Sequence, residues 1–85
     1  MESEILLYPL STEKTLRLME SENQLVFIVS LKARKANIKQ AFEEMFKVKV
    51  VQVNTLVTPK GKKKAYIKLS PEHLALDIAT QLGMM

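Results

Sequence analysis

The sequence predicts a small α+β sandwich in which about three helices pack against a mainly antiparallel sheet of four strands. Three observations predict this class: short β-branched runs alternate with helical stripes, turn residues separate them, and 47% of the 85 residues are hydrophobic. A chain of this length has material for one core. We therefore expect residues 1–85 to form a single domain.

The first strand and the first helix are expected close to the N-terminus. Residues 5–8 predict a short strand, which ends at the following proline because proline cannot donate to a sheet ladder. Ser11 or Thr12 can then cap a helix that runs to about Glu20. Glu13 lies in the first turn of this helix, where the helix dipole favours an acid.

A polar turn at residues 21–23 leads into a strand at residues 24–31 that is apolar on both faces, which predicts a place inside the sheet. A second helix is expected at about residues 35–47, because its apolar positions recur at i, i+3, i+4, i+7 and i+8 and form one stripe. These positions hold Ile38, Ala41, Phe42, Met45 and Phe46.

The second half of the chain predicts a hairpin. Residues 48–58 form a long β-branched strand, and residues 58–61 have Pro and Gly placed for a tight turn in which Gly61 takes a positive φ. The return strand is expected at residues 64–69. One of its faces carries Ala65, Ile67 and Leu69, and the other carries Lys64, Tyr66 and Lys68.

The last helix is expected to open at Ser70 as the N-cap, with Pro71 in the first turn, and to end at Gly83. Its inward side would carry Ala75, Ile78, Ala79 and Leu82.

The net charge of +4 hides a strong segregation. Residues 1–31 carry two cations and five acids, a net charge of −3, and residues 69–85 carry two acids. Residues 32–68 carry eleven cations and two acids, a net charge of +9. Such segregation in a small body predicts a positive face for a polyanion, first nucleic acid and second an anionic membrane surface.

Nothing in the sequence indicates catalysis or a metal site. The chain has no cysteine, and its single histidine, His73, stands near no nucleophile motif. Glu43 and Glu44 are adjacent on a helix and point about 100° apart. Two isolated glycines cannot build a phosphate-binding loop. We therefore expect a cytoplasmic protein that is not an enzyme and has no cofactor.

Two basic clusters could bind phosphate. Lys32, Arg34 and Lys35 lie at the start of the second helix, where the dipole disfavours each cation by about 0.3–1 kcal/mol. A phosphate shared with the helix end would remove this conflict, and the alternative is that the three side chains extend into solvent. The second cluster is formed by the lysines of the hairpin tip, Lys60, Lys62, Lys63 and Lys64. They could neutralise phosphates, or they could only protect a sheet edge from pairing with another strand. We expect them at the surface, where they contribute little to stability.

Few aromatic residues are present to stack on bases, and Tyr66 is either a stacking platform or a packed residue. This scarcity favours recognition of the backbone and shape of structured RNA. The alternative is a non-ribosomal, RNA-recognition-type regulator that binds single-stranded RNA.

The sequence resembles the universal large ribosomal subunit protein twenty-three family over nearly its whole length. The resemblance rests on Tyr8-Pro9, Ser11-Thr12-Glu13-Lys14, Ala41-Phe42, Phe46-Lys47-Val48, Val53-Asn54-Thr55 and Lys64-Ala65-Tyr66-Ile67. It implies a sheet in the order 1-2-4-3, related to ferredoxin-like folds, and a structural role on large-subunit ribosomal RNA near the polypeptide exit tunnel. There, a neighbouring small ribosomal protein and nascent-chain factors such as the signal recognition particle would be its protein partners, and the free chain would be a monomer.

The charge pattern and the resemblance together assign RNA contacts to twelve residues. These are Lys14, Lys32, Arg34, Lys35, Lys39, Asn54, Thr55, Lys60, Lys62, Lys63, Lys64 and Lys68. Glu13 matches the acid with which bacterial relatives dock trigger factor, which implies a protein-docking role. The ending Leu76-Asp77-Ile78-Ala79 resembles the archaeal and eukaryotic version, and the short hairpin turn departs from bacterial relatives. Eukaryotic relatives have a long basic N-terminal extension that this sequence lacks, so we expect the archaeal type.

Overall fold

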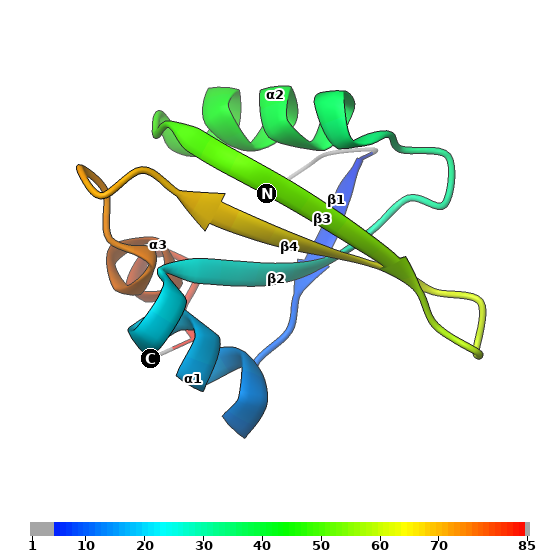
Figure 1. Cartoon of the computed structure of the whole chain (residues 1–85), viewed down its shortest axis with the longest axis horizontal. Helices are drawn as coiled ribbons and strands as arrows, with labels where there is room; N and C mark the ends of the chain where they lie inside the picture. Colours follow the sequence, from blue (N-terminus) through cyan, green and yellow to red (C-terminus); the bar gives the residue numbers. More distant parts are fainter. Residues whose placement is uncertain (1–4, 85) are drawn as a thin grey trace.

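The computed structural model describes residues 5–84 as seven elements around one sheet (Figure 1). They are β1 (Leu6–Pro9), α1 (Glu13–Glu22), β2 (Gln24–Val29), α2 (Lys35–Phe46), β3 (Val50–Val57), β4 (Lys63–Leu69) and α3 (Ala75–Gln81). All strand pairs are antiparallel and the order is β1-β2-β4-β3. Both the predicted fold class and the strand order are confirmed.

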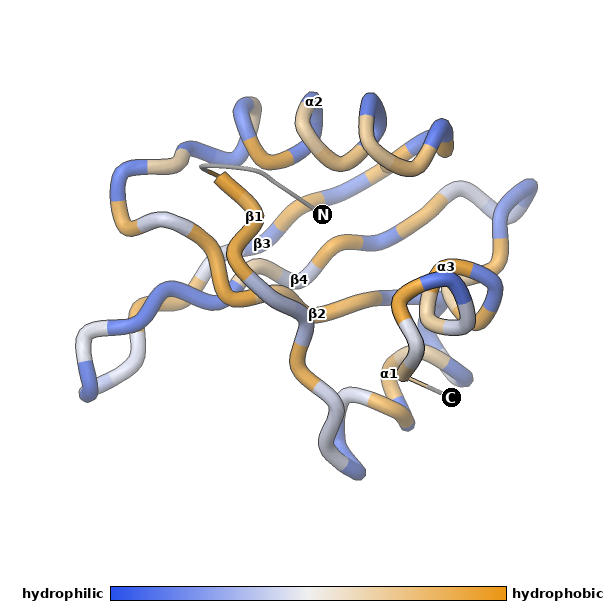
Figure 2. The backbone as a smooth tube through the Cα atoms, turned by 180° about the vertical axis from the view of Figure 1, so that it is seen from behind, coloured by the Kyte–Doolittle hydropathy of each residue, from blue (hydrophilic) through white to orange (hydrophobic). Residues whose placement is uncertain are grey.

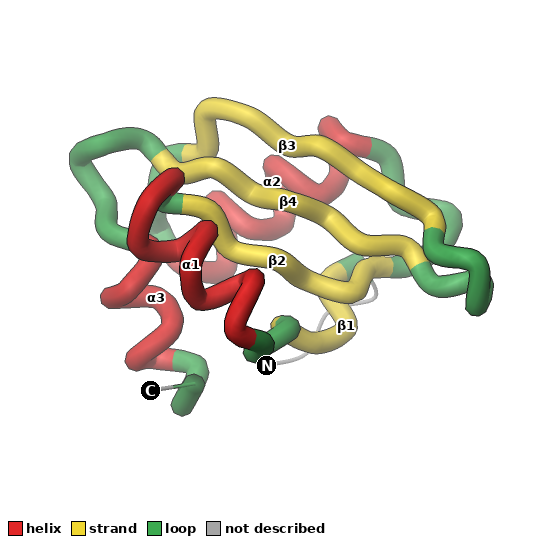
Figure 3. The backbone as a smooth tube through the Cα atoms, turned by 60° about the horizontal axis from the view of Figure 1, so that its bottom comes forward, coloured by secondary structure: helices red, strands yellow, loops and turns green. Residues whose placement is uncertain are grey.

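The helices lie at three different places around the sheet. Figure 3 shows α1 in front of the sheet and α2 behind it, so each covers one face. The short β1 pairs only with residues 27–29 of β2. The remaining part of that edge lies beside α3, which also packs against α1.

The strand β2 is the centre of the core. Its last five residues are buried, so both of its faces are covered, as the sequence predicts for an inner strand. On the side of α2, the Phe27 ring meets the edge of the Phe42 ring at a centroid distance of 5.6 Å and an angle of 83°. Ile38 and Phe42 are fully buried, which confirms the predicted stripe of α2.

A reciprocal cap starts α1. Thr12 Oγ1 accepts from the backbone N–H of Thr15 at 3.2 Å, and Thr15 Oγ1 accepts from the backbone N–H of Thr12 at 2.8 Å. Thr12, rather than Ser11, is therefore the N-cap. The helix runs to Glu22, two residues beyond the predicted end, because the left-handed Asn23 is what terminates it.

Several strand boundaries differ from prediction by one or two residues. Strand β2 stops at Val29 because a turn follows, in which the Ala33 N–H donates to the Ser30 carbonyl at 3.0 Å. Strand β3 starts at Val50 because Lys47 ends α2 in the left-handed conformation and the Val50 N–H donates to Glu43 Oε2 at 2.9 Å. In both cases a turn outside the ladder takes the missing residues.

The predicted tight turn of the β3–β4 hairpin is confirmed. Gly61 has a φ of 81°, and its N–H donates to the Thr58 carbonyl at 2.9 Å. The Thr58 N–H closes the loop by donating to the Lys62 carbonyl at 2.7 Å. The hairpin projects beyond the rest of the fold, at the right in Figure 1.

The predicted start of α3 at Ser70 is wrong. Residues 70–74 form a separate turn, in which the His73 N–H donates to the Ser70 carbonyl at 2.9 Å, and the helix begins at Ala75. The helix end is as predicted, with Gly83 at a φ of 75°. The N-cap position, Leu74, has no side-chain hydrogen bond to offer.

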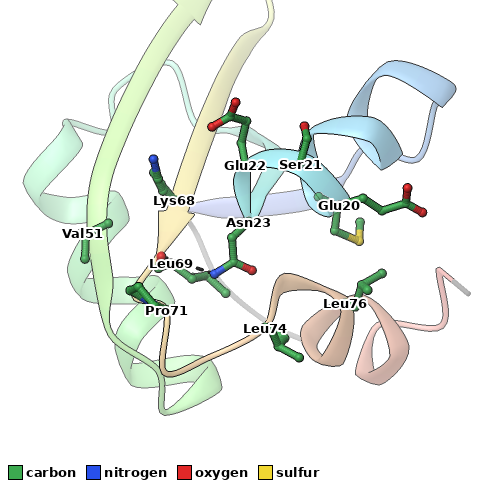
Figure 4. A pocket seen from close by; sticks show the side chains of 11 residues that line it. Glu20, Ser21, Glu22, Asn23, Val51, Lys68, Leu69, Pro71, Leu74 and Leu76 are labelled. Carbon is green, nitrogen blue, oxygen red and sulfur yellow. Dashed lines mark hydrogen bonds between the residues drawn. The ribbon is translucent and has the colours of Figure 1, made fainter.

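Asn23, fifty residues away, supplies the missing cap. Its Oδ1 accepts from the Ala75 N–H at 2.7 Å, and its Nδ2 donates to the carbonyls of His73 at 2.8 Å, Ser70 at 3.4 Å and Leu69 at 3.4 Å. Figure 4 shows this side chain directed from the end of α1 toward Leu69. One amide thus joins α1, β4 and α3.

We expect Asn23→Gly to lower the free energy of unfolding by about 1–3 kcal/mol, since backbone groups of the 70–75 turn lose their partners. Glycine tolerates the φ of 55° at this position, so the decrease reports on the amide and not on backbone strain. Urea unfolding measures it. Asn23→Asp, which retains only the acceptor, should also be less stable than the parent. A Gly variant as stable as the parent would contradict the capping role.

Candidate nucleic-acid interface

The cross-strand register divides the predicted RNA-binding residues between the two faces of the sheet. On β4, Lys64 lies opposite Leu56 of β3 and Ile28 of β2. The next row contains Asn54, Tyr66 and Val26, and the third contains Gln52, Lys68 and Gln24. Directly opposed residues share a face, so these rows form one surface, which we call the open sheet face.

Helix α1 covers only the part of the open sheet face that lies over β2 (Figure 3). Gln52, Asn54 and Leu56 are exposed, and Lys64 and Lys68 are half-buried. Half-burial of a lysine places its methylene stem on the sheet and leaves the ammonium accessible. The open sheet face therefore combines cations with an amide donor.

A second basic surface lies on the side of α2. Arg34 is the N-cap of α2 and Lys35 its first residue, and both are exposed, as are Lys32 and Lys39. The Arg34 N–H donates to Asn37 Oδ1 at 3.2 Å, which satisfies one donor of this end. Figure 2 shows hydrophilic residues along the outer side of α2.

Asn54 and Thr55, both predicted to contact RNA, do not share a surface. Thr55 lies opposite the buried Ala65 on the face that α2 covers, whereas Asn54 lies opposite Tyr66 on the open sheet face. Thr55 is half-buried and Asn54 exposed. The cause is the two-residue period of a strand, which sends neighbours to opposite faces.

The lysines of the hairpin are not equivalent. Lys63 is half-buried, and its Nζ donates to the carbonyl of Ala33, just before α2. Lys62 Nζ donates to the Tyr8 hydroxyl at 3.0 Å and lies 5.7 Å from the centre of the Tyr8 ring. The expectation that these lysines lie at the surface is confirmed for Lys62, which is exposed, and is wrong for Lys63, which is half-buried. The two contacts tie the hairpin to β1 and to the start of α2.

A groove of about 510 Å³ lies between the hairpin and the start of α1. Its apolar part is formed by Tyr8, Leu10 and Ile28. Polar residues complete it: Thr12, Thr58, Lys60, Lys62 and Lys64, together with Pro59. Sequence reasoning missed Tyr8, because its place next to three lysines depends on pairing between β1 and β2 and on the direction of the hairpin.

The predicted docking residue Glu13 and the predicted RNA contact Lys14 lie side by side on the first turn of α1. Glu13 and Lys14 are both exposed. Neighbours on a helix diverge by about 100°, so the two side chains can meet different partners.

Residues 5–84 show few features of a metal site, a catalytic site or a membrane-spanning segment. No group of three acidic or histidine side chains there is placed to hold a metal ion. The backbone of His73 takes part in the turn before α3, where its N–H donates to the Ser70 carbonyl and its carbonyl accepts from Asn23. None of the described helices has both the length and the apolar character needed to cross a membrane.

The chain is similar in sequence to known proteins over most of its length. A family model described as ribosomal protein L23 matches residues 4–75. A large ribosomal subunit protein uL23 of Methanococcus aeolicus is 49% identical over 81 residues, which are 95% of this chain and 94% of the relative. A large ribosomal subunit protein uL23 of Methanothermobacter thermautotrophicus is 50% identical over 80 residues, 94% of this chain and 93% of the relative.

We expect Lys63→Met to lower the free energy of unfolding by about 1–3 kcal/mol, because it removes a hydrogen bond from a charged donor to the Ala33 carbonyl. Lys64→Met is the matched control, since Lys64 is its neighbour on β4 but faces the open side of the sheet. Urea unfolding of both variants gives the comparison. Equal stabilities would mean that the Lys63 side chain does not hold the hairpin.

Proposed function

The chain belongs to the ribosomal protein L23 family, and from this premise we propose that it is a structural component of the large ribosomal subunit that binds large-subunit ribosomal RNA near the polypeptide exit tunnel. Its relatives are archaeal large-subunit proteins, and ribosomal proteins of archaea are cytoplasmic. Family membership favours this function over a non-ribosomal regulator of single-stranded RNA.

The observation that carries the proposal is the concentration of positive charge. Residues 32–68 have a net charge of +9, and nine of their eleven cations lie around the hairpin, the open sheet face and the start of α2. The other two, Lys47 and Lys49, follow α2 at the far end of β3. Each phosphate that a lysine or arginine neutralises releases counterions from the RNA. A surface of this kind binds RNA tightly and with a strong dependence on salt.

Each basic surface supports a different part of the RNA contact. Lys35 and Lys39 lie one turn apart on the exposed side of α2, and the first turn of this helix contains no acidic residue. A phosphate near Arg34 would relieve the repulsion between these cations and the helix dipole. On the open sheet face, the exposed amide of Asn54 can donate to RNA sugar or phosphate oxygens, while Lys64 and Lys68 supply charge.

The protein partners follow from the exposed motif of α1. We assign Lys14 to the RNA, with Glu13 as the docking residue for the signal recognition particle or another factor at the tunnel exit. Both side chains are exposed and point in different directions, so both contacts can form at once. A neighbouring small ribosomal protein of the large subunit completes the set of partners.

We expect the double variant Lys60→Gln and Lys64→Gln to flatten the plot of log K against log salt for a large-subunit ribosomal RNA fragment. The slope should fall by about 0.7–0.9 for each phosphate that these lysines no longer neutralise. Filter binding over a salt series measures it.

Lys47→Gln with Lys49→Gln is the matched control for that experiment. These lysines lie at the opposite end of β3 from the hairpin and are outside the predicted interface. Both double variants have the same net charge, so identical slopes would show that the hairpin does not contact the phosphates.

We expect large subunits carrying Glu13→Lys to bind the signal recognition particle more weakly while the protein remains in the subunit. Removing the acid from the first turn costs about 0.3–1 kcal/mol of stability whether or not docking occurs, so affinity is the measurement that decides. Glu20→Lys, at an exposed position of the same helix, is the control. An unchanged affinity would leave Glu13 with the helix-start role alone.

A further inference from the structure

Two grooves meet at the Tyr8 side chain. The first, of about 510 Å³, lies toward the start of α1, and the second, of about 570 Å³, lies toward the turn that precedes α2. Three residues line both: Tyr8, Ile28 and Lys62. The contact between the Lys62 ammonium and the Tyr8 hydroxyl therefore forms the wall between the grooves.

The lining of these grooves has an unusual combination of properties for a surface of this protein. The floor is apolar, with Ile28 only 5% exposed, and Tyr8 stands above it with 41% of its surface exposed. Five lysines surround the floor: Lys32, Lys60, Lys62, Lys63 and Lys64. Among the described residues that line either groove, none is acidic.

A third groove, near Asn23, lacks this combination of an aromatic ring and several lysines. It has a similar apolar character but contains Glu20 and Glu22 beside a single lysine, Lys68, and it has no aromatic ring (Figure 4). The charged residues of its lining sum to −1, so this groove favours an anionic ligand less than the grooves beside Tyr8 do. Charge thus separates the two sites within one small domain.

We propose that the grooves beside Tyr8 hold an unpaired nucleotide of the bound RNA, with its base stacked on the Tyr8 ring and its phosphates next to the hairpin lysines. The inference rests on the proposed RNA-binding function and adds a base contact to it. An unpaired nucleotide has the required chemistry, since it joins a flat, weakly polar base to an anionic backbone. The grooves also have the size of small-ligand sites, which is about 300–1,000 Å³.

The structure prepares Tyr8 for this contact in a way that it does not prepare Tyr66. The hydrogen bond from Lys62 to the Tyr8 hydroxyl fixes the ring from its edge, at 3.0 Å, and leaves part of the ring accessible. Tyr66 is half-buried between its cross-strand neighbours Val26 and Asn54 and lines neither groove. Tyr66 therefore serves as the internal control.

The composition of the chain makes the test direct. It contains no tryptophan and two tyrosines, so the variant Tyr66→Phe leaves Tyr8 as the sole source of long-wavelength protein fluorescence. The full-length variant is titrated with a short oligoadenylate and, separately, with inorganic polyphosphate, a polyanion without bases. Stacking predicts that oligoadenylate quenches the emission of Tyr8, while polyphosphate binds without comparable quenching.

Affinity provides the second measurement. Relative to Tyr8→Phe, which lacks the same hydroxyl, Tyr8→Leu should weaken oligoadenylate binding by about 5- to 150-fold, the usual effect of one stacked base, while the salt slope and polyphosphate binding are the same in both variants. Tyr8→Phe keeps the ring and should retain most of the affinity. Tyr66→Leu should change it little, and circular dichroism establishes that each variant is folded.

The outcomes separate the inference from the proposed function. Salt-dependent binding of oligoadenylate without Tyr8 quenching, or with full affinity in Tyr8→Leu, would overturn the stacking site and leave RNA binding intact. A failure of the chain to bind oligoadenylate, polyphosphate and large-subunit ribosomal RNA would overturn both. Quenching by oligoadenylate together with weaker binding in Tyr8→Leu supports both.

Discussion

The structure depends on the burial of β2 on both of its faces. Because Phe27 packs against α2 while Val26 and Ile28 lie on the face that α1 partly covers, one strand of six residues joins the layers of the fold. A strand inside the sheet also needs hydrogen-bonding partners along both of its edges, and β1 and β4 supply them. The β3–β4 hairpin then joins the sheet through β4, with β3 packed against α2, and its turn extends away from the core. The place of the basic tip is thus a consequence of packing around β2.

Two lysines of the basic hairpin tip are held in place by hydrogen bonds. Lysine side chains lose considerable conformational entropy when they are held, yet Lys63 and Lys62 each have a defined acceptor, the Ala33 carbonyl and the Tyr8 hydroxyl. Both contacts connect the hairpin to segments more than twenty residues away. These contacts set the direction from which the hairpin presents Lys60 and Lys64, which lowers the ordering cost of the RNA complex that we propose.

Much of this could be predicted from local patterns, and the errors have a common cause. Alternation, helical stripes and turn residues identified all seven elements, since their signals lie within a few neighbouring residues. The start of α3 was wrong because Ser70 and Pro71 look like a helix opening, whereas the effective cap is Asn23. The roles of Lys63 and Tyr8 were missed for the same reason. Each depends on a partner that only the register of the sheet brings close.

The register also constrains the shape of the RNA that the proposed function requires. Lys64 and Asn54 lie on the open sheet face, whereas Lys35 and Lys39 belong to α2 on the opposite side, and the sheet separates the two groups. A flat or straight RNA surface can meet only one of them. The hairpin is the place where both basic surfaces converge, because Lys63 reaches toward the start of α2 while Lys62 and Lys64 face the other side. RNA that contacts both groups must enclose the hairpin, which is what a folded RNA with several helices can do and a short single strand cannot.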